Sequence, residues 1–407
     1  MRVSEQPSQQ PSTQPQKDHR VLGRELDLFS FQDIAPGAPF WHPKGMVLFK
    51  ELERRLRALL DRDYEETSTP IMVKKDVFER SGHWQYYREN MFYFDVDGET
   101  YVLKPMNCPE STYIYKSHVR SWRELPVRLS EIGRLHRNEL SGVLGGLFRV
   151  RQITMDDAHI YCTQEQMTDE VVAILRLLDR FYNEIFQFPM TYYLATRPKK
   201  ALGSRAEWDR AEAALKNALD AHRVAYKTDE GEGAFYGPKI EVHVKDALGR
   251  DWQLGTVQLD LFLSRNFDAT YIDAKGERVH PVVIHRAIFG SFERFIGMLL
   301  EHTGGALPFW LSPVQVTVLS IQEAATPYAR MVNEKLDASG LRVRLDNRDE
   351  TVNKKIREAE LQKIPYLLII GEKEAAAKTV ALRERGAGDQ GIFLLDEAVK
   401  KLAALRQ

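Results

Sequence analysis

Cysteine is scarce in this chain, and long hydrophobic runs and an excess of one charge are absent. Two cysteines in 407 residues exclude a disulfide framework. No apolar run reaches the roughly 18 residues that a membrane-spanning helix needs. The 57 basic residues balance 58 acidic ones, which argues against a dedicated nucleic-acid scaffold but leaves room for a local basic face. The N-terminus lacks the apolar core of a signal peptide, so we expect a cytoplasmic protein.

The pattern of polar and apolar residues divides the chain into three parts. Residues 1–20 are rich in Gln, Pro and Ser and are expected to form a disordered tail. Residues 21–309 combine amphipathic helices with alternating strands bounded by turns, which predicts an α+β domain built on an antiparallel sheet. Residues 310–407 alternate strand and helix patterns and predict a small α/β domain.

Three side chains with metal-binding chemistry are far apart in the sequence. Cys108 lies in KPMNCPE, His159 in DDAHIY and His285 in VVIHRAIFG. One thiolate and two imidazoles suit zinc. Their spacing matches no short metal-binding motif, and each residue taken alone is more often a packed core residue.

Arginines occupy positions that suit an anionic ligand. Arg137 and Glu139 stand two apart in RLHRNE, so on a strand they would share one face. Arg149 follows a glycine-containing loop, and Arg294 begins a predicted helix in GSFERF. A guanidinium binds phosphate or carboxylate through two hydrogen bonds, or stacks on a planar ring. The alternative interpretation is a solvated hairpin with ordinary ion pairs and a helix start with a packing glycine.

Taken together, these segments resemble a known family. The helix ending in YEETSTPIM, the pair RLHRNE and FRVR, and GSFERF resemble the three signature motifs of class II aminoacyl-tRNA synthetases. KPMNCP, DDAHIYC, GEGAFYGPKIEVHVKD, QLGTVQLD and VIHRAIFGSFERF resemble the threonyl-tRNA synthetase family, and the resemblance runs from about residue 20 to the C-terminus. It implies a class II antiparallel sheet flanked by helices, followed by a small α/β anticodon-binding domain. Motif one implies a homodimer.

The resemblance also implies roles for individual residues. A zinc ion, one per subunit, is implied at Cys108, His159 and His285. Catalytic roles are implied for Arg137, Arg294, His83 and Lys239. ATP contacts are implied for Arg137, Glu139, Arg149, Gln253, Thr256 and Arg294. Threonine contacts are implied for Met155, Asp157, Tyr236 and Gln258. Anticodon contacts are implied for Asp349, Lys363, Glu374 and Arg383.

The implied activity is threonine–tRNA ligation. Threonine and ATP, with Mg²⁺, would give threonyl-adenylate, and the threonyl group would pass to the 3′-terminal ribose of threonine tRNA. Basic residues of the predicted helix near Lys354 and Lys355 are expected to meet tRNA phosphates. Only about 20 residues precede the predicted catalytic domain, so we expect no editing domain in the chain.

Several positions depart from the family pattern. Glu110 and Ser111 follow Cys108 where Gly and His are usual, and Ile153 and Met155 replace an aromatic residue and a glutamine. Asp349 and Lys363 also replace the usual Asn and Arg. These departures leave two alternatives open: a synthetase paralogue that adenylates another β-hydroxy amino acid, and a non-catalytic regulator. The presence of Arg137, Arg149 and Arg294 argues against a regulator, and the predicted anticodon domain together with His83 argues against a paralogue.

Overall fold

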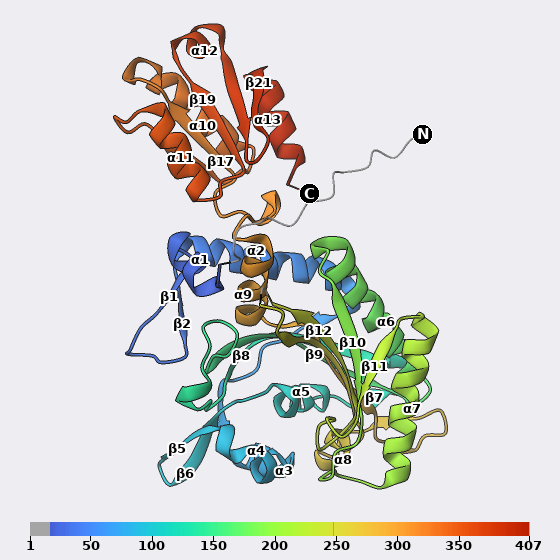
Figure 1. Ribbon diagram of the computed structural model, residues 1–407. Helices are drawn as coiled ribbons and strands as arrows, with labels where there is room; N and C mark the ends of the chain where they lie inside the picture. The colour runs from blue at the N-terminus through green and yellow to red at the C-terminus, as the bar shows by residue number, and fades with distance from the viewer. Residues whose placement is uncertain (1–16, 247, 407) are drawn as a thin grey trace.

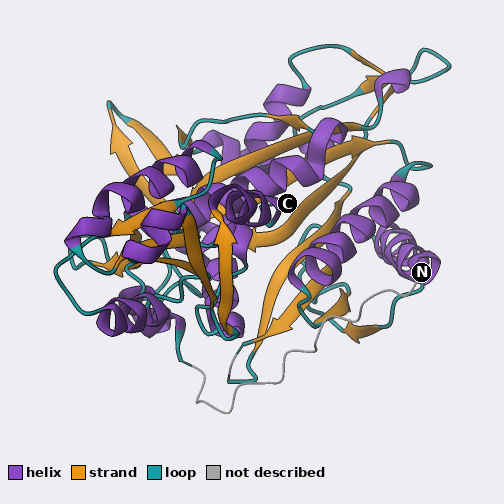
Figure 2. Ribbon diagram, turned by 90° about the horizontal axis from the view of Figure 1, so that it is seen from above, coloured by secondary structure: helices purple, strands orange, loops and turns teal. Residues whose placement is uncertain are grey.

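Two bodies make up the protein in the computed structural model, which describes residues 17–246 and 248–406. A large lower body carries the long sheet, and the C-terminal body sits above it in Figure 1. The view from above in Figure 2 therefore projects the C-terminal helices onto the strands of the large sheet. Within the described part of the chain, no helix combines the length and the apolar character that crossing a membrane demands.

The large body is built on an eight-stranded sheet. Its strands in spatial order are β11 (Tyr226–Asp229), β10 (Met190–Ala195), β12 (Lys239–Lys245), β13 (Asp251–Asp260), β16 (Val282–Ser291), β9 (Gln152–Cys162), β8 (Val127–His136) and β3 (Glu65–Glu66). The five inner pairings from β10 to β8 are antiparallel, and only the edge pairs β10–β11 and β8–β3 are parallel. The predicted antiparallel sheet is therefore confirmed.

Helices cover both faces of this sheet. One face carries α2 (Pro43–Leu60), α6 (Met167–Asp179), α7 (Arg205–His222) and α9 (Phe292–Thr303). The other carries α5 (Cys108–Tyr115), with α3 (Asp76–Arg80), α4 (His83–Tyr87), α8 (Leu263–Asn266) and the small sheet β4 (Met72–Lys74), β5 (Phe92–Val96) and β6 (Glu99–Leu103) beside it. Peripheral elements are α1 (His19–Glu25), β1 (Phe29–Phe31), β2 (Pro39–Trp41), β7 (Arg120–Ser121), β14 (Tyr271–Ile272) and β15 (Arg278–Val279).

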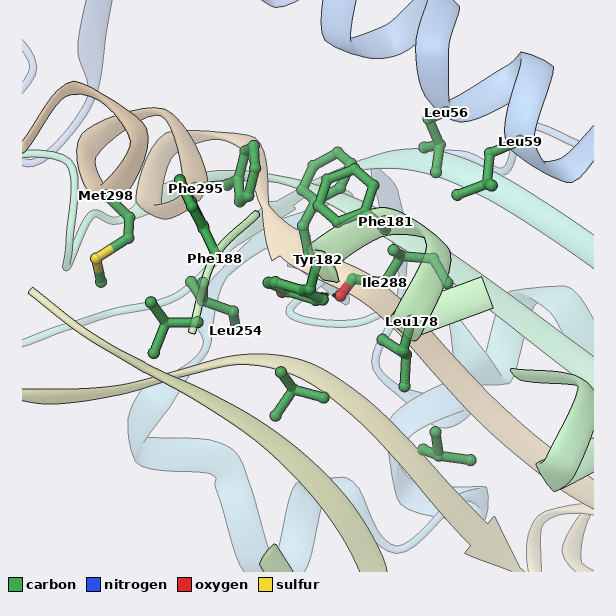
Figure 3. Close-up of a cluster of buried hydrophobic side chains, with 14 of the residues drawn as sticks. Leu56, Leu59, Leu178, Phe181, Tyr182, Phe188, Leu254, Ile288, Phe295 and Met298 are labelled. Carbon is green, nitrogen blue, oxygen red and sulfur yellow. Dashed lines mark hydrogen bonds between the residues drawn. The ribbon is translucent and has the colours of Figure 1, made fainter. Parts of the chain in front are cut away.

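Side chains alternate along each strand, so the large sheet has one face that packs in the main core and a second face that is turned toward α5. In β9, Ile160 and Cys162 are buried in the main core with α2, α6 and α9. Tyr161 between them is buried in a second core with α5, as the two-residue period of a strand requires. Figure 3 shows part of the main core, where the Tyr182 hydroxyl donates a 3.0 Å hydrogen bond to the carbonyl of Ile288.

Helix α2 forms where the leucine spacing predicts a helix. Leu48, Leu52, Leu56 and Leu59 are all buried on one side, and each buried leucine contributes about 1.5–3 kcal/mol of transfer free energy. Pro43 occupies the first turn, where its missing N–H costs no hydrogen bond.

The C-terminal body has a mixed five-stranded sheet. Its spatial order is β18 (Val343–Asp346), β17 (Val316–Ser320), β19 (Tyr366–Ile370), β20 (Thr379–Glu384) and β21 (Gly388–Leu394). The first three strands are parallel and the last two are antiparallel. Its helices are α10 (Thr326–Ala338), α11 (Val352–Leu361), α12 (Glu372–Ala377) and α13 (Leu395–Ala404). The expected domain boundary at residues 309–310 lies in a short 3₁₀ turn, Phe309–Leu311.

Polar contacts join the two bodies. The Arg342 guanidinium donates to the Glu51 carboxylate of α2 at 2.8 Å and to the carbonyl of Trp310 at 2.6 Å. The Gln362 amide donates to the carbonyl of Glu25 at 2.8 Å. These bonds attach the C-terminal body to α1, α2 and the connecting turn.

Two sequence-based expectations differ from the structure. The predicted tail of residues 1–20 lies mostly outside the described residues, but α1 already begins at His19, because Asp18 caps the helix and the imidazole is buried. Arg137 and Glu139 do not share a strand face, because β8 ends at His136. They follow it in a turn in which the N–H of Glu139 donates to the carbonyl of Arg137 at 2.8 Å.

Candidate active site

Seven of the predicted site residues occupy one face of four neighbouring strands. This face carries alternate residues of each strand, because side chains one apart point to opposite sides. They are Met155, Asp157 and His159 of β9, His285 of β16, Thr256 and Gln258 of β13, and Lys239 of β12. They line a cleft of about 280 Å³ together with Cys108 from α5 and with Arg137, Arg149 and Arg294. The intervening residues Ile160, Val257 and Ile284 belong to the core.

The three predicted zinc ligands come together at one end of the cleft. Candidate ligand atoms of Cys108, His159 and His285 all lie within 4.8 Å of one another. The two imidazole rings stand nearly perpendicular, with centroids 4.9 Å apart. The buried Nε2 of His159 has no hydrogen-bond partner among the described residues, and a buried polar atom normally has one. A metal ion would satisfy it.

The electrostatics of this cluster agree with a metal site. Burial, and then the neighbouring His285, hold the pKa of His159 well below its usual value, which keeps the imidazole in its neutral, ligating form. Burial raises the pKa of the Cys108 thiol, and a bound dication would reverse this by stabilising the thiolate. The Asp260 carboxylate lies 3.3 Å from Nε2 of His285, the arrangement that orients a histidine ligand. The donor set therefore fits zinc.

Asp157 is held beside the cluster by a residue that our sequence analysis missed. The side-chain amide of Asn107 donates to Oδ2 of Asp157 at 2.9 Å. Asn107 is fully buried, and it lies over Gly133, where a Cβ atom would come 2.4 Å from Oδ1 of Asn107. Its position next to Cys108 in KPMNCP could have identified Asn107 as a site residue from the sequence. Asn107 therefore orients the carboxylate that the resemblance assigns to the threonine hydroxyl.

Arginines gather at the other end of the cleft. Arg137, Arg149 and Arg294 all line it, together with Glu139. The Arg149 guanidinium lies 3.8 Å from the Glu139 carboxylate. The structure thus joins the two arms of the loop at residues 137–151 with the start of α9. Three guanidinium groups with one carboxylate between them leave an excess of positive charge for an anion.

Arg294 is locked in place by backbone carbonyls. Its Nε donates to the carbonyl of Phe148 at 2.9 Å, and its NH1 donates to the carbonyl of Gln253 at 2.8 Å. Burial, followed by the charges of Arg137 and Arg149, lowers the pKa of Arg294 to about 10. The guanidinium plane is therefore charged at neutral pH and fixed in orientation, as stacking on a planar base requires.

The remaining predicted polar residues of the cleft are paired with one another. The Tyr236 hydroxyl donates to Oε1 of Gln258 at 3.3 Å. The Gln253 amide donates to the hydroxyl of Thr256 at 2.8 Å. Lys239 forms a 2.5 Å ion pair with Glu241. These pairs place amide, hydroxyl and ammonium groups around the cleft in fixed positions.

His83 lies behind the cleft and does not line it. Its ring centroid is 5.7 Å from that of Tyr236 and 5.5 Å from that of Phe235, and its Nδ1 lies 2.8 Å from the hydroxyl of Ser81. Burial lowers the pKa of His83 to about 4, so the imidazole is neutral at physiological pH. A proton on Nδ1, donated to Ser81, would leave Nε2 as an acceptor.

Three of the unusual positions lie in the cleft or in the helix beside it. Ile153 packs with Leu135 and Val150, and Met155 packs against this cluster, so they form an apolar wall. Glu110 is almost fully buried, and its carboxylate finds no hydrogen-bond partner among the described residues. Burial raises the pKa of Glu110 to about 8.

The predicted anticodon residues fall into two groups. Asp349 and Glu374 follow the carboxyl ends of β18 and β19, whereas Lys363 precedes β19 and Arg383 is paired with Leu367 near its start. The structure therefore does not gather the four at one edge.

The basic side chains of α11 differ from one another as well. Lys355 was expected to meet tRNA phosphates, but it is buried and donates to the carbonyl of Ser320 at 2.8 Å, so this expectation was wrong. Lys354 faces solvent and pairs with Glu350.

Comparisons with known proteins agree with this geometry. Residues 91–303 match the tRNA synthetase class II core domain (G, H, P, S and T), and residues 315–405 match the anticodon binding domain. The chain is 50% identical over 389 residues to a threonine–tRNA ligase of Carboxydothermus hydrogenoformans and 51% identical over 387 residues to one of Caldanaerobacter subterraneus subsp. tengcongensis. Each match covers 95% of this chain but only 61% and 60% of the relative. The chain thus spans about three fifths of the length of these curated relatives, and the expected absence of an editing domain stays a prediction.

Solved structures show the same relationship. The RNA binding domain of threonyl-tRNA synthetase from Cryptosporidium parvum Iowa II superposes with a TM-score of 0.92 at 44% identity, covering 96% of this chain and 98% of that one. A putative threonyl-tRNA synthetase, ThrRS-1, from Aeropyrum pernix superposes with a TM-score of 0.84 at 30% identity, covering 96% of this chain and 94% of that one. The chain therefore belongs to the threonyl-tRNA synthetase family of class II aminoacyl-tRNA synthetases.

Proposed function

We propose that the protein is a threonine–tRNA ligase. One observation carries the proposal: a single cleft is lined by the close cluster of Cys108, His159 and His285, by the Asp157 carboxylate and by three arginines. In the proposed reaction the carboxylate of threonine attacks the α-phosphate of ATP, which gives threonyl-adenylate and pyrophosphate. The hydroxyl of the terminal tRNA ribose then attacks the acyl carbon and releases AMP.

The amino-acid end of the cleft selects the substrate. Cys108, His159 and His285 would hold zinc with part of its coordination left open to the substrate, and the metal would act there as a Lewis acid toward the polar groups of threonine. Asp157, oriented by Asn107, accepts a hydrogen bond from the substrate hydroxyl. Valine has nearly the same shape but leaves these polar groups unpaired, and such a site rejects it far better than an apolar pocket does. Serine retains the hydroxyl and is expected to enter.

The arginines act on the nucleotide. In this proposal Arg137, which lines the cleft, contacts the α-phosphate and the carboxylate of threonine, and Arg149 contacts the γ-phosphate. Fixed positive charge aimed at the oxygens of the α-phosphate stabilises the charge that develops there, without reorganisation during the reaction. Arg294, held by two carbonyls, stacks on adenine, and Glu139 accepts from the adenine amino group. Mg²⁺ brought in with ATP would supply further positive charge for the pyrophosphate leaving group.

His83 is proposed to assist the transfer to tRNA. A pKa of about 4 makes it a weak base, so it relays a proton from the ribose hydroxyl only as the tRNA end enters and the local surroundings change. The C-terminal domain at residues 315–405 is proposed to bind the anticodon of threonine tRNA. The protein is proposed to act in the cytoplasm.

A homodimer is proposed from an uncovered apolar surface. Met72, Phe94 and Val96 share one face of the small sheet β4–β6–β5 and are 49%, 40% and 41% exposed. Ile71, at the end of motif one, is 41% exposed beside them. Large exposed apolar side chains on one sheet face suit a protein interface, and the exposed Lys74–Glu99 ion pair on the same face adds polar groups to it. A double variant, Met72→Glu with Phe94→Glu, is expected to halve the mass measured by light scattering, and an unchanged mass contradicts this interface.

The test of the ligase is ATP–pyrophosphate exchange with threonine, serine and valine, followed by charging of threonine tRNA. Exchange with threonine, weaker exchange with serine and almost none with valine, all abolished by chelation and restored by zinc, is the expected result. Threonine-dependent exchange without tRNA charging would favour a paralogue with another acceptor. No exchange with any of the three amino acids by the zinc-loaded protein would refute the proposal.

A further inference from the structure

His19 makes contacts in α1 that neither the sequence analysis nor the reaction above uses. The side chain is 2% exposed. Nδ1 lies 2.8 Å from Oε1 of Glu301 in α9, and Nε2 accepts a 3.0 Å hydrogen bond from the backbone N–H of Leu147. Since an amide N–H can only donate, Nε2 must carry the lone pair, and Nδ1 must carry the proton that Glu301 accepts.

These bonds exclude a second metal site at the same place. Ligand atoms of Asp18, His19 and Glu301 lie within 4.8 Å of one another and resemble a metal cluster. Both ring nitrogens of His19 are already engaged, however, one as donor and one as acceptor. The imidazole is therefore a structural connector between α1, α9 and the loop that carries Leu147.

The loop that His19 holds leads directly into the arginine end of the cleft. Leu147 is followed by Phe148, whose ring packs against the His19 imidazole at a tilt of 36° and a centroid distance of 4.3 Å. The carbonyl of Phe148 receives Nε of Arg294 at 2.9 Å, and Arg149 comes next in the chain. Gly146, which precedes Leu147, adopts φ +56°, and a Cβ atom at this glycine would lie 2.3 Å from Nε2 of His19. The close approach of loop to imidazole thus requires glycine.

The outgoing half of this loop is not held in the same way. Leu140 and Val143 are 75% and 41% exposed, and a Cβ at Gly142 or Gly145 would meet nothing within 4 Å. The return arm of the loop, which is the part that contains Leu147 and Phe148 and leads to Arg149, is in contrast buried at Leu147 and Phe148. His19 therefore contacts the loop at the point where its exposed half meets its buried half.

We propose that His19 is a positioning residue of the nucleotide end of the cleft. It fixes the return arm of the loop at residues 137–151 against α9 and so sets the places of Arg149 and Arg294. This inference rests on the proposed function, because it assumes that these arginines bind ATP. It predicts that damage at His19 weakens ATP binding and leaves threonine recognition, at the zinc end, intact.

Two substitutions separate the two hydrogen bonds of His19. The amide of His19→Asn reaches the place of Nδ1 and keeps the bond to Glu301, but it leaves the buried N–H of Leu147 without an acceptor. The amide of His19→Gln reaches the place of Nε2 and can accept from Leu147. The loop is then expected to shift in the free protein until this N–H finds another acceptor, and bringing it back into place when ATP binds is expected to lower the affinity roughly tenfold. Leu22→Ala, in the same helix, is the matched control, because it loosens α1 without deleting either bond.

The first measurement is the Kd of ATP with Mg²⁺ by calorimetry, without amino acid. His19→Asn is expected to raise this Kd about tenfold while the KM for threonine in exchange stays within twofold, and His19→Gln is expected to restore ATP binding. The proposal is overturned if His19→Asn binds ATP like the wild type, or if Leu22→Ala weakens ATP binding equally. Absence of exchange by the wild-type protein would instead refute the ligase.

Hydrogen exchange on the wild-type protein is a second test that does not depend on how the variants fold. The amide of Leu147 is expected to exchange at least tenfold more slowly than that of Gly142 at the loop tip, because His19 accepts its proton. Equal exchange rates at the two positions would show that the bond to His19 does not hold the loop.

Discussion

Asn107 offers the most direct test of how the threonine pocket is built. Its amide donates to Oδ2 of Asp157 at 2.9 Å from a fully buried position. A hydrogen bond to a charged group contributes about 1.5–3 kcal/mol. If the bond is needed in the transition state, Asn107→Ala lowers kcat/KM for threonine by roughly 10- to 150-fold. The KM for ATP, set by the arginines at the far end of the cleft, is expected to stay within about twofold.

Gly133 supplies the internal control. A Cβ at this position would lie 2.4 Å from Oδ1 of Asn107, so Gly133→Ala must displace the amide and is expected to reproduce the loss of kcat/KM. In the Asn107→Ala background the same methyl group enters vacated space. The double variant is therefore expected to be no worse than Asn107→Ala alone, a non-additivity that only direct contact produces.

The assay is threonine-dependent ATP–pyrophosphate exchange at saturating ATP, with melting temperature as the check on folding. A folded Asn107→Ala protein that loses less than about threefold in kcat/KM would refute the assigned role of the bond. Additive losses in the double variant would refute the steric argument at Gly133, since the two residues would then act separately.

Three further results are expected. Burial raises the pKa of Glu293 to about 7, so the folded state binds a proton that the unfolded state releases, and the wild-type protein loses stability as pH rises from about 4.5 through 7. Glu293→Gln can still accept from the N–H of Thr154 and is expected to gain up to about 3 kcal/mol in unfolding free energy relative to wild type between pH 5 and pH 8. Denaturant melts measure this difference, and a difference that does not change with pH contradicts the prediction. Cys108→Ala is expected to lower the zinc content found by elemental analysis from one ion per chain to a small fraction, and an unchanged content rejects the site. Lys354→Ala is expected to raise the KM for tRNA in a salt-dependent way, whereas the buried Lys355→Ala lowers the melting temperature instead; identical effects on tRNA binding contradict the distinction.

Local patterns in the sequence were sufficient for the architecture. The leucine spacing from Leu48 to Leu59 predicts a helix because residues three and four apart share a face, and α2 forms there. Alternation in the segments of β8 and β9 predicts antiparallel strands, and these two strands pair antiparallel in the sheet. The segment that starts at His285 was expected to be helical throughout, but its residues up to Ser291 belong to β16, and the helix begins only at Phe292. The signature motifs and the segments around Cys108 and His285 indicated the family, which the comparisons confirm.

Other features depend on contacts that no local pattern records. Arg137 and Glu139 were expected on a strand, but the strand ends at His136, because boundaries depend on which partner residues are available for pairing. Lys355 looks like a solvated basic residue, yet the fold buries it beside Ser320. His19 falls in a segment that composition assigned to a tail, although its partners, Leu147 and Glu301, lie more than a hundred residues away.

The sequence by itself thus determined which residue types are present, which segments form helices and strands, and to which family the chain belongs. These properties follow from periodicity and short motifs, which are local. The family resemblance already implied that Cys108, His159 and His285 share one site, but the tertiary structure alone decided that Asn107 orients Asp157 and that His19 holds the return arm of the loop. Such contacts depend on strand order and register, because each strand presents only every second residue to the cleft and its neighbours come from distant parts of the chain.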